Sequence, residues 1–452
     1  MKFRYIVTGV LSAAMFFAGS SCKKAFVDPD INKDPNNPVS VSSSALLPSV
    51  EVAMGYAFGS DFSRWGSLFA QQITGADRQF ASYQQYVFST QDFDNVWSLD
   101  YGAIMKNLQI MIKTSPAGTN GYNPYASIAK ILMAYTIVTT TDYWGDVPYS
   151  DAFNGLSGLQ PKYDKQQDIY TAAHALLADA IKNLSSKGAT AGTAEPGADD
   201  VVYGGKINRW IKLANVLQAR LYIHVSKFDN TAPQKALDAI AAGGFTSNDE
   251  DFQVIFGTAA TSNAPYFQFE QNRGGYLSYT QSYWYNTMVS MNDPRLPVLI
   301  DTANSTIGAF YGSAASPVPL VTNMEQIFIQ AEAYARLNNL PAAGAAYAAA
   351  VTASFKKFGL DTATANTYLA ANPFTATTQA QALQQIMFQK YLAMYLSPEV
   401  FTDWRRTGVP ALTPSAGTQI PRRFLYPQQE ISYNLANVNS KLTLFSRVWW
   451  DQ

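Results

Sequence analysis

Two stretches of the sequence combine aromatic side chains with arginine and amide groups. Residues 77–88 read DRQFASYQQYVF, and residues 270–284 read EQNRGGYLSYTQSYW. A glycan offers flat apolar faces that stack on aromatic rings and hydroxyls that pair with Arg, Asn, Gln or Asp, so its binding site needs both kinds of group. The candidate ligand-binding residues are Arg78, Tyr83, Tyr86, Arg273, Tyr276, Tyr283 and Trp284. The alternative for each aromatic residue is the hydrophobic core, which the helical positions of Trp65 and Trp97 favour more strongly.

Side chains suited to catalysis are scarce in this sequence. Zinc sites and Cys-His or Ser-His nucleophilic pairs need histidine or cysteine, and the sequence contains only two histidines and one cysteine. His174 and His224 both follow the spacing of leucines on predicted helices, which is typical of packed residues. A glycoside hydrolase needs two carboxylates about 5 to 10 Å apart, and no passage places such a pair among the aromatic residues. We therefore expect no catalytic residue, no metal and no cofactor.

The chain begins with the features of a lipoprotein signal peptide. Lys2 and Arg4 precede an apolar run, residues 5–18, which is too short for a membrane span of about 20 residues. Small residues follow, and then Cys22, the only cysteine. We expect residues 1–21 to be removed and Cys22 to carry lipid; the alternative is a stray cysteine in a discarded signal. Residues 22–45 are rich in Asp, Asn, Pro and Ser and predict an extended tether.

Composition predicts a globular body over residues 46–452. Hydrophobic residues make up 47% of the chain and aromatic residues 13%, so a large core is expected. Charged residues are only 14%, well below the usual quarter. Surface polarity must therefore come from Ser, Thr, Asn and Gln, which suits a surface that faces sugars or peptides. The net charge of -1 excludes electrostatic attraction to nucleic acid.

Apolar residues at helical spacing predict an all-α body. The clearest unit is residues 323–360, which read as two helices with Leu340-Pro341 ending the first. Its alanine-rich faces are typical of a tetratricopeptide-like pair that needs stacked neighbours, although any antiparallel helical hairpin is the alternative. Further helices are expected at residues 46–58, 63–73, 97–111, 124–138, 164–184, 207–228, 234–242 and 383–394.

Three regions lack helical spacing and are expected to be irregular. The largest, residues 245–319, is rich in Gly, Asn, Ser and Tyr, and we expect a few short strands within it. Because function concentrates on long loops over a rigid scaffold, this region is predicted to carry most of the ligand-binding face. The other two are the Thr/Ala/Asn-rich connection at residues 361–378 and the chain from residue 397 onward.

Four ordered passages carry a resemblance to a known family. They are DYWGDVPYSDAF at residues 142–153, NDPRL at 292–296, MEQIFIQAEAY at 324–334, and the two halves of residues 389–434, QKYLAMYLSPEVFTDWRRTGVPAL and PRRFLYPQQEISYN. Together with the lipoprotein start and DINKDPNNP, they make the chain resemble the SusD/RagB family from end to end. Each motif alone is weak, but the ordered set is specific.

The resemblance implies a location, a partner and a function. It implies a lipid-anchored outer-membrane protein that faces the cell exterior and lids a SusC-like TonB-dependent transporter. Such a protein captures glycan, or sometimes peptide, for import without catalysis. One departure is Lys23-Lys24 directly after the cysteine, where acidic residues usually accompany surface export. The competing functions are a surface glycoside hydrolase and a tetratricopeptide-type scaffold for protein partners.

The arginines of the matched motifs are expected to be structural. Arg405 and Arg406 lie in Trp-Arg-Arg-Thr-Gly, close to Asp403, and Arg422 and Arg423 follow in the next motif. A guanidinium pairs well with carboxylates and backbone carbonyls, so these four residues are predicted to tie loops to helices. A ligand-facing role for any of them is the alternative.

Overall fold

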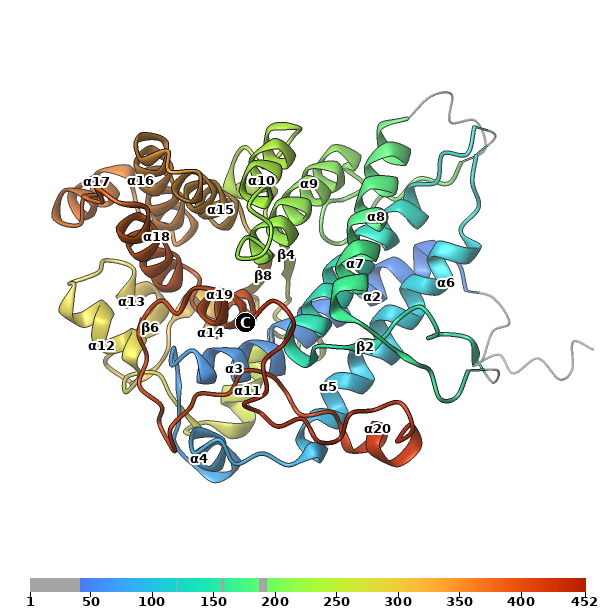
Figure 1. Ribbon diagram of the computed structural model, residues 1–452, viewed down its shortest axis with the longest axis horizontal. Helices are drawn as coiled ribbons and strands as arrows, with labels where there is room; N and C mark the ends of the chain where they lie inside the picture. The colour runs from blue at the N-terminus through green and yellow to red at the C-terminus, as the bar shows by residue number, and fades with distance from the viewer. Residues whose placement is uncertain (1–40, 119, 156–157, 187–192) are drawn as a thin grey trace, which may run out of the picture. The chain divides into compact units, whose positions relative to one another are not determined.

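Helix α7 (Pro124–Trp144) is buried along nearly its whole length, because apolar residues occur on all of its faces. Asn123 caps the helix by accepting a hydrogen bond from the backbone N–H of Ala126, and Pro124 occupies the first turn, where its missing donor costs nothing. Gly145, with φ of 80°, ends it. The other elements of the body surround α7, α8 (Gln166–Ser185) and α9 (Ile207–His224) (Figure 1).

The computed structural model describes residues 41–118, 120–155, 158–186 and 193–452. Residues Ser43–Gln452 form one unit, which is the body described below. The predicted signal peptide, Cys22 and most of the predicted tether lie outside the described residues. Helix α2 (Ser43–Phe58) includes residues 43–45, the last three of the predicted tether. Among the described residues, no helix is both long enough and apolar enough to cross a membrane.

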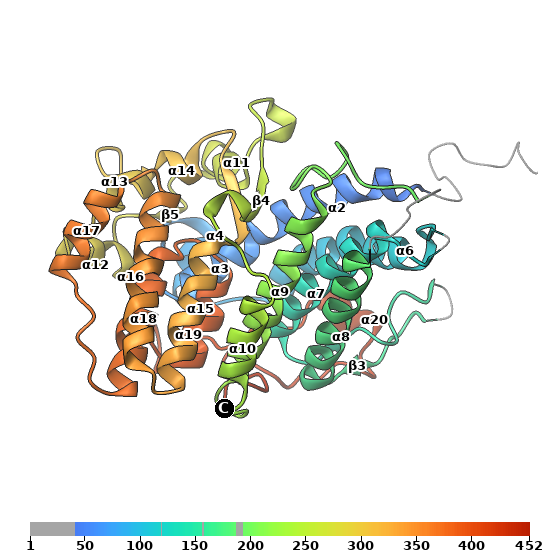
Figure 2. The ribbon, with the colours of Figure 1, turned by 90° about the horizontal axis from the view of Figure 1, so that it is seen from above.

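Consecutive helices pack as pairs, and the pairs stand side by side. The pairs are α7 with α8, α9 with α10 (Ala232–Ala241), and α15 (Asn323–Arg336) with α16 (Leu340–Lys357). Figure 2 shows these helices in one row, in which α8 contacts α9 and α10 contacts α15. The predicted all-α fold of tetratricopeptide-like pairs is therefore confirmed.

The turn of the α15–α16 pair differs from the prediction in one detail. Leu340 and Pro341 begin α16 rather than ending α15, which stops at Arg336. Asn339 caps α16 by accepting a hydrogen bond from the N–H of Ala342. Proline is well suited to this first turn because its N–H would have no helical partner there.

Helices also occupy the two smaller regions that were predicted to be irregular. In residues 361–378, Asp361 caps α17 (Thr362–Ala371) by accepting a hydrogen bond from the N–H of Thr364. After residue 397 the chain forms α19 (Glu399–Thr407), which ends at Gly408 in the left-handed conformation. Both helices are short, so their apolar spacing extends over too few turns to be recognised in the sequence.

Residues 245–319 form short elements, including the expected short strands. Strand β4 (Phe252–Ile255) pairs antiparallel with β8 (Pro317–Val321), and β6 (Ile300–Asp301) pairs with β7 (Thr306–Ile307). Four short helices also form here, which the prediction of irregular segments missed. They are α11 (Pro265–Arg273), α12 (Tyr283–Ser290), α13 (Leu296–Leu299) and α14 (Ala309–Gly312).

The remaining elements complete the body around this core. The helices are α3 (Asp61–Phe69), α4 (Arg78–Gln84), η1 (Thr90–Phe93), α5 (Asp94–Ser98), η2 (Leu99–Met105), α6 (Lys106–Thr114), η4 (Asn248–Glu250), η5 (Ala260–Ser262), α18 (Gln379–Ala393) and α20 (Gln428–Tyr433). The strands are β1 (Thr74–Gly75) with β5 (Leu277–Ser278), and β2 (Val147–Pro148) with β3 (Tyr163–Asp164). The predicted helix at residues 97–111 is thus divided among α5, η2 and α6, and η2 has the wider π-helical hydrogen bonding.

Candidate ligand-binding site

A cavity of about 500 Å³ lies between η2–α6 and the chain that follows β2. We call it the aromatic cavity. Its main lining side chains are Trp97, Tyr101, Lys106, Ile110, Phe153 and Glu430. Its volume falls in the range of small-molecule sites, and its mostly apolar walls with a few polar groups match their usual composition.

Three aromatic rings form a stack along the wall of the aromatic cavity. Tyr101 stacks on Trp97 with 4.4 Å between ring centroids, and Phe153 lies nearly parallel to Tyr101 at 6.1 Å. Trp97 is buried and meets Trp144 of α7 edge to face at 5.2 Å, so the stack is anchored to the central helix. The half-buried Tyr101 also donates a hydrogen bond to the carbonyl of Pro148 at 2.8 Å. These contacts fix a flat apolar surface that a sugar ring can stack on.

The backbone at Phe153 is strained. Its φ is 64°, which is unusual for a bulky residue that is not glycine. Such strain persists only where the surrounding structure imposes it, and it occurs most often at functional sites. Here it holds the Phe153 ring beside Tyr101 at the wall of the cavity.

Polar groups complete the lining of the aromatic cavity. Lys106, Gln109 and Lys113 come from one face of α6, because they are spaced by three and four residues. Neither lysine has a carboxylate partner among the described residues. On the other side, Glu430 accepts hydrogen bonds from the Tyr163 hydroxyl at 2.8 Å and from the Asn434 amide at 3.1 Å. Amine, amide and carboxylate groups therefore surround the aromatic stack, where sugar hydroxyls would need them.

Two adjacent residues of the π-helical segment η2, Asp100 and Tyr101, lie in different environments. Tyr101 lines the cavity, while Asp100 is fully buried and accepts a hydrogen bond from the Thr140 hydroxyl of α7. Burial raises the pKa of Asp100 to about 8, although the hydrogen bond from Thr140 acts in the opposite direction. This raised pKa favours the protonated form of Asp100 at neutral pH, beside Thr140 of α7.

The structure brings the two predicted stretches together but buries part of each. Strand β1, just before residues 77–88, pairs with β5 inside residues 270–284, and the Tyr276 carbonyl accepts a hydrogen bond from the N–H of Ala76. Arg78 and Arg273 are exposed, and Tyr276 and Tyr283 are half-buried. A ligand-binding role for these four residues stays a prediction.

Three predicted residues are buried, so the expectation of exposed rings was wrong for them. Trp284 is 0% exposed, stacks on Tyr395 at 4.0 Å and donates to the carbonyl of Leu392. Tyr83 stacks on Phe88 at 4.3 Å and donates its hydroxyl to Asp92. Tyr86 is also buried, and its hydroxyl accepts the N–H of Ser415. Trp284 and Tyr86 thus contact distant parts of the chain, whereas these two partners of Tyr83 lie within nine residues of it.

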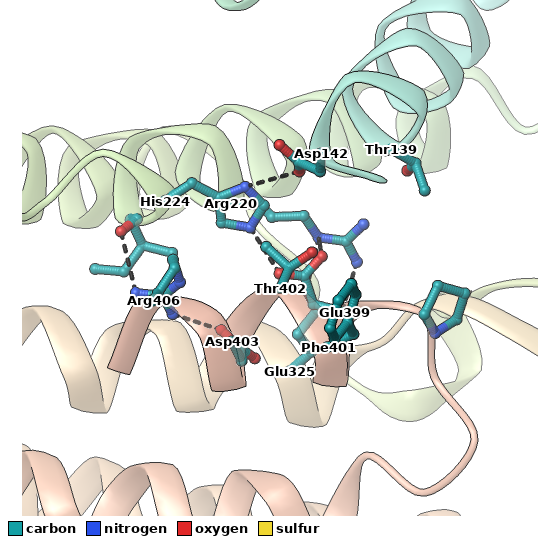
Figure 3. Close-up of polar contacts among 12 residues, drawn as sticks. Thr139, Asp142, Arg220, His224, Glu325, Glu399, Phe401, Thr402, Asp403 and Arg406 are labelled. Carbon is teal, nitrogen blue, oxygen red and sulfur yellow. Dashed lines mark hydrogen bonds and ion pairs between the residues drawn. The ribbon is translucent and has the colours of Figure 1, made fainter. Parts of the chain in front are cut away.

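A buried network of charges lies away from the aromatic cavity. His224 lies between two carboxylates, with Nε2 2.6 Å from Glu399 and Nδ1 3.3 Å from Asp142 (Figure 3). Burial opposes protonation, but the two carboxylates outweigh it and raise the pKa of His224 to about 9. The space beside this network is only about 10 Å³, too small for a sugar. The network therefore joins α7, α9 and α19 and offers no catalytic cleft.

Three of the four motif arginines have the predicted structural role. Arg405 donates to the carbonyls of Asp142 and Arg422, and Arg406 pairs with Glu332 at 2.7 Å and also with Asp403. Arg422 pairs with Asp451.

Arg423 differs from the other three motif arginines. It donates to the carbonyl of Phe424 through Nε and forms no ion pair among the described residues. The prediction of a structural tie is thus confirmed for three arginines and only partly for the fourth. No group of three or more potential metal ligands occurs in the described parts of the chain.

Comparison with known proteins identifies the family. A sequence model of the SusD-like family, described as starch-binding and associating with the outer membrane, matches residues 35–315 and 305–427. No curated protein sequence matches the chain.

Solved structures show the same fold. A chitin-binding protein is 23% identical, with a TM-score of 0.76 over 91% of this chain and 100% of that one. A SusD/RagB family protein from Bacteroides thetaiotaomicron is 25% identical, with a TM-score of 0.71 over 91% and 99%. A chitin-binding SusD homolog from Flavobacterium johnsoniae is 22% identical, with a TM-score of 0.72 over 91% and 97%. The chain therefore belongs to the SusD-like family.

Proposed function

We propose that this chain binds a glycan in the aromatic cavity, without cleaving it, as a lipid-anchored protein of the outer membrane. The observation that carries the proposal is the stack of Trp97, Tyr101 and Phe153 along the wall of a cavity lined by amine, amide and carboxylate groups. A sugar ring stacks on such a surface while its hydroxyls pair with the surrounding polar groups. The family description as starch-binding and two relatives named chitin-binding support this class of ligand.

Binding without cleavage is supported by the acidic groups at the cavity. Glycoside hydrolysis uses two carboxyl groups that flank the bond to be cleaved, about 5 to 10 Å apart. Among the described lining residues, Glu430 supplies the only carboxylate, and it already accepts hydrogen bonds from Tyr163 and Asn434.

Two further parts of the proposal rest on the family and on the N-terminal sequence. The lipid on Cys22 would anchor the protein to the outer membrane, and a SusC-like TonB-dependent transporter would receive the glycan for import. A membrane extract of the source cells, passed over the immobilised chain, tests this partnership. Recovery of a TonB-dependent barrel supports it, and retention of glycan without any barrel contradicts it.

The glycan proposal is tested with the chain lacking residues 1–22 on an array of neutral and acidic glycans. Tyr101→Ala and Phe153→Ala should each weaken the best ligand by roughly tenfold or more, because each removes a stacking surface. Tyr433→Ala is the matched control, since Tyr433 is 76% exposed and lies outside the lining of the cavity. Release of reducing ends from any bound glycan would identify a hydrolase instead.

A further inference from the structure

A second cavity, of about 550 Å³, lies between the β2–β3 region and the C-terminal segment. We call it the Arg423 cavity. The residues that matter for its chemistry are Arg423, Lys162, Lys165, Arg447, Tyr426 and Asp146. It is more polar than the aromatic cavity and belongs to none of the sites described above.

Arg423 is a buried cation that forms no ion pair among the described residues. It is 3% exposed, and its guanidinium lies over the Tyr426 ring at 4.7 Å from the centroid. Nε donates to the carbonyl of Phe424, while Nη2 is buried and has no hydrogen-bond partner among the described residues. A buried guanidinium with an unused donor costs free energy unless something else satisfies it. Arg423 therefore places a positive charge in the lining of the cavity that no carboxylate neutralises among the described residues.

The surrounding charges also favour an anion. The Lys165 ammonium forms an ion pair with the Asp146 carboxylate at 2.7 Å. The same carboxylate accepts a hydrogen bond from the backbone N–H of Gln166, so Asp146 is already paired with donors other than Arg423. Lys162 is exposed and has no carboxylate partner in the described ranges. Four cationic side chains line this cavity, but Lys165 pairs with Asp146 and Arg447 lies 3.6 Å from Asp451. Lys162 and Arg423 are then the two without an ion pair among the described residues. Such a local excess of positive charge attracts an anionic ligand.

The two cavities border on the same pair of residues. Tyr163 lines the Arg423 cavity, Glu430 lines the aromatic cavity, and the Tyr163 hydroxyl donates to Glu430 at 2.8 Å. The Tyr163–Glu430 pair therefore lies between the two cavities.

We propose that the Arg423 cavity binds an anionic group, carboxylate or sulfate ester, of the glycan held in the aromatic cavity. This proposal rests on the proposed glycan-binding function and assigns an acidic sugar as its ligand class. A guanidinium stays charged and holds its N–H donors in a fixed plane, which a lysine ammonium cannot reproduce.

The test compares matched sugars on the full chain in mild detergent by isothermal titration calorimetry. The probes are glucuronate, glucose 6-sulfate and glucose, which differ in the anionic group. At least one acidic probe should bind about tenfold or more tightly than glucose, since charged hydrogen bonds supply that difference. Whichever acidic probe binds more tightly identifies the anion, carboxylate or sulfate. If both bind no better than glucose, or no probe binds up to its solubility limit, the proposal is overturned.

Variants distinguish binding in the Arg423 cavity from nonspecific attraction of the probe to positively charged side chains. Arg423→Lys and the exposed-site change Lys162→Gln should each weaken the acidic probe, whereas Lys356→Gln, on the exposed face of α16, should leave it unchanged. Lys162→Gln decides the matter if Arg423→Lys fails to fold. Equal losses in Lys162→Gln and Lys356→Gln would refute a specific cavity. Neutral glycans that bind through Tyr101, while acidic probes show no preference, would overturn this inference and leave the proposed function intact.

Discussion

Arg406 and Arg423 are the same residue type in neighbouring motifs, yet their surroundings give them different chemistry. Arg406 is neutralised by Glu332 and Asp403, which come from a distant helix and from its own helix. Arg423 has an aromatic ring beneath it and no carboxylate partner in the part of the chain that the structure describes. Arg406 is a structural tie, whereas the proposed role of Arg423 is to bind an anion.

The sequence indicated which residue types could bind a ligand, but it did not show which of these side chains are exposed and which are buried. Tyr276 and Trp284 belong to one aromatic stretch, but Trp284 packs on Tyr395 of the distant C-terminal region and Tyr276 is half-buried. Tyr101 and Phe153 were missed because they meet only in the folded chain, 52 positions apart. The positive φ of Phe153 has no signal in the sequence.

Asp100 should make the stability of the protein depend on pH. Its pKa is about 8 in the folded chain, against an ordinary value near 4, so between these values the folded state keeps a proton that the unfolded state releases. The free energy of unfolding should therefore decrease by roughly 1 kcal/mol per pH unit from this group alone as pH rises from 4 to 8. Asp100→Asn should remove that contribution, as measured by urea unfolding at several pH values.

The control for this experiment is Asp168→Asn, an exposed carboxylate on α8. It should leave the pH dependence of unfolding parallel to that of the unchanged chain. An Asp100→Asn profile that is equally parallel would show that Asp100 does not hold the proton.

At the scale of elements, long periodic helices were predictable and short helices such as α17 and α19 were not. The α15–α16 pair follows from its apolar spacing, and Thr322 caps α15 through the N–H of Glu325. The π-helical segment Leu99–Met105 was hidden within an otherwise regular helical pattern. Its widened turn depends on packing against α2 and α7, which local sequence does not encode.

Helix α3 should be sensitive to one added methyl group at Gly66. A Cβ there would come within 2.4 Å of the Tyr143 hydroxyl of α7 and 3.4 Å of Phe401 of α19. The Tyr143 hydroxyl is fixed by donating to the carbonyls of Phe62 and Pro398. Gly66→Ala should therefore lower the free energy of unfolding by about 1–3 kcal/mol, measured by chemical denaturation.

Two further variants test whether the loss of stability in Gly66→Ala comes from the contact with Tyr143. Gly102→Ala should be nearly neutral, because a Cβ at that position meets no atom within 4 Å. Combining Gly66→Ala with Tyr143→Phe should cost less than the sum of the single changes, since the phenylalanine lacks the crowded oxygen. Strict additivity would mean that the clash is relieved elsewhere.

At the scale of the whole molecule, the chain is expected to combine a helical body with a lipid anchor. Cys22→Ser should abolish incorporation of labelled palmitate and release the protein from the membrane pellet, because the anchor would be acyl chains rather than a spanning helix. Persistence of both label and pelleting in Cys22→Ser would contradict the anchor and direct attention to another attachment.

The central claim is that the aromatic cavity holds a glycan and does not cleave it. The most direct measurement titrates the best array ligand into the chain and into Tyr101→Ala, and then assays the mixture for new reducing ends. We expect saturable binding that Tyr101→Ala weakens by roughly tenfold or more, with no reducing ends released. Unchanged affinity in Tyr101→Ala, or turnover of the bound glycan, would contradict it.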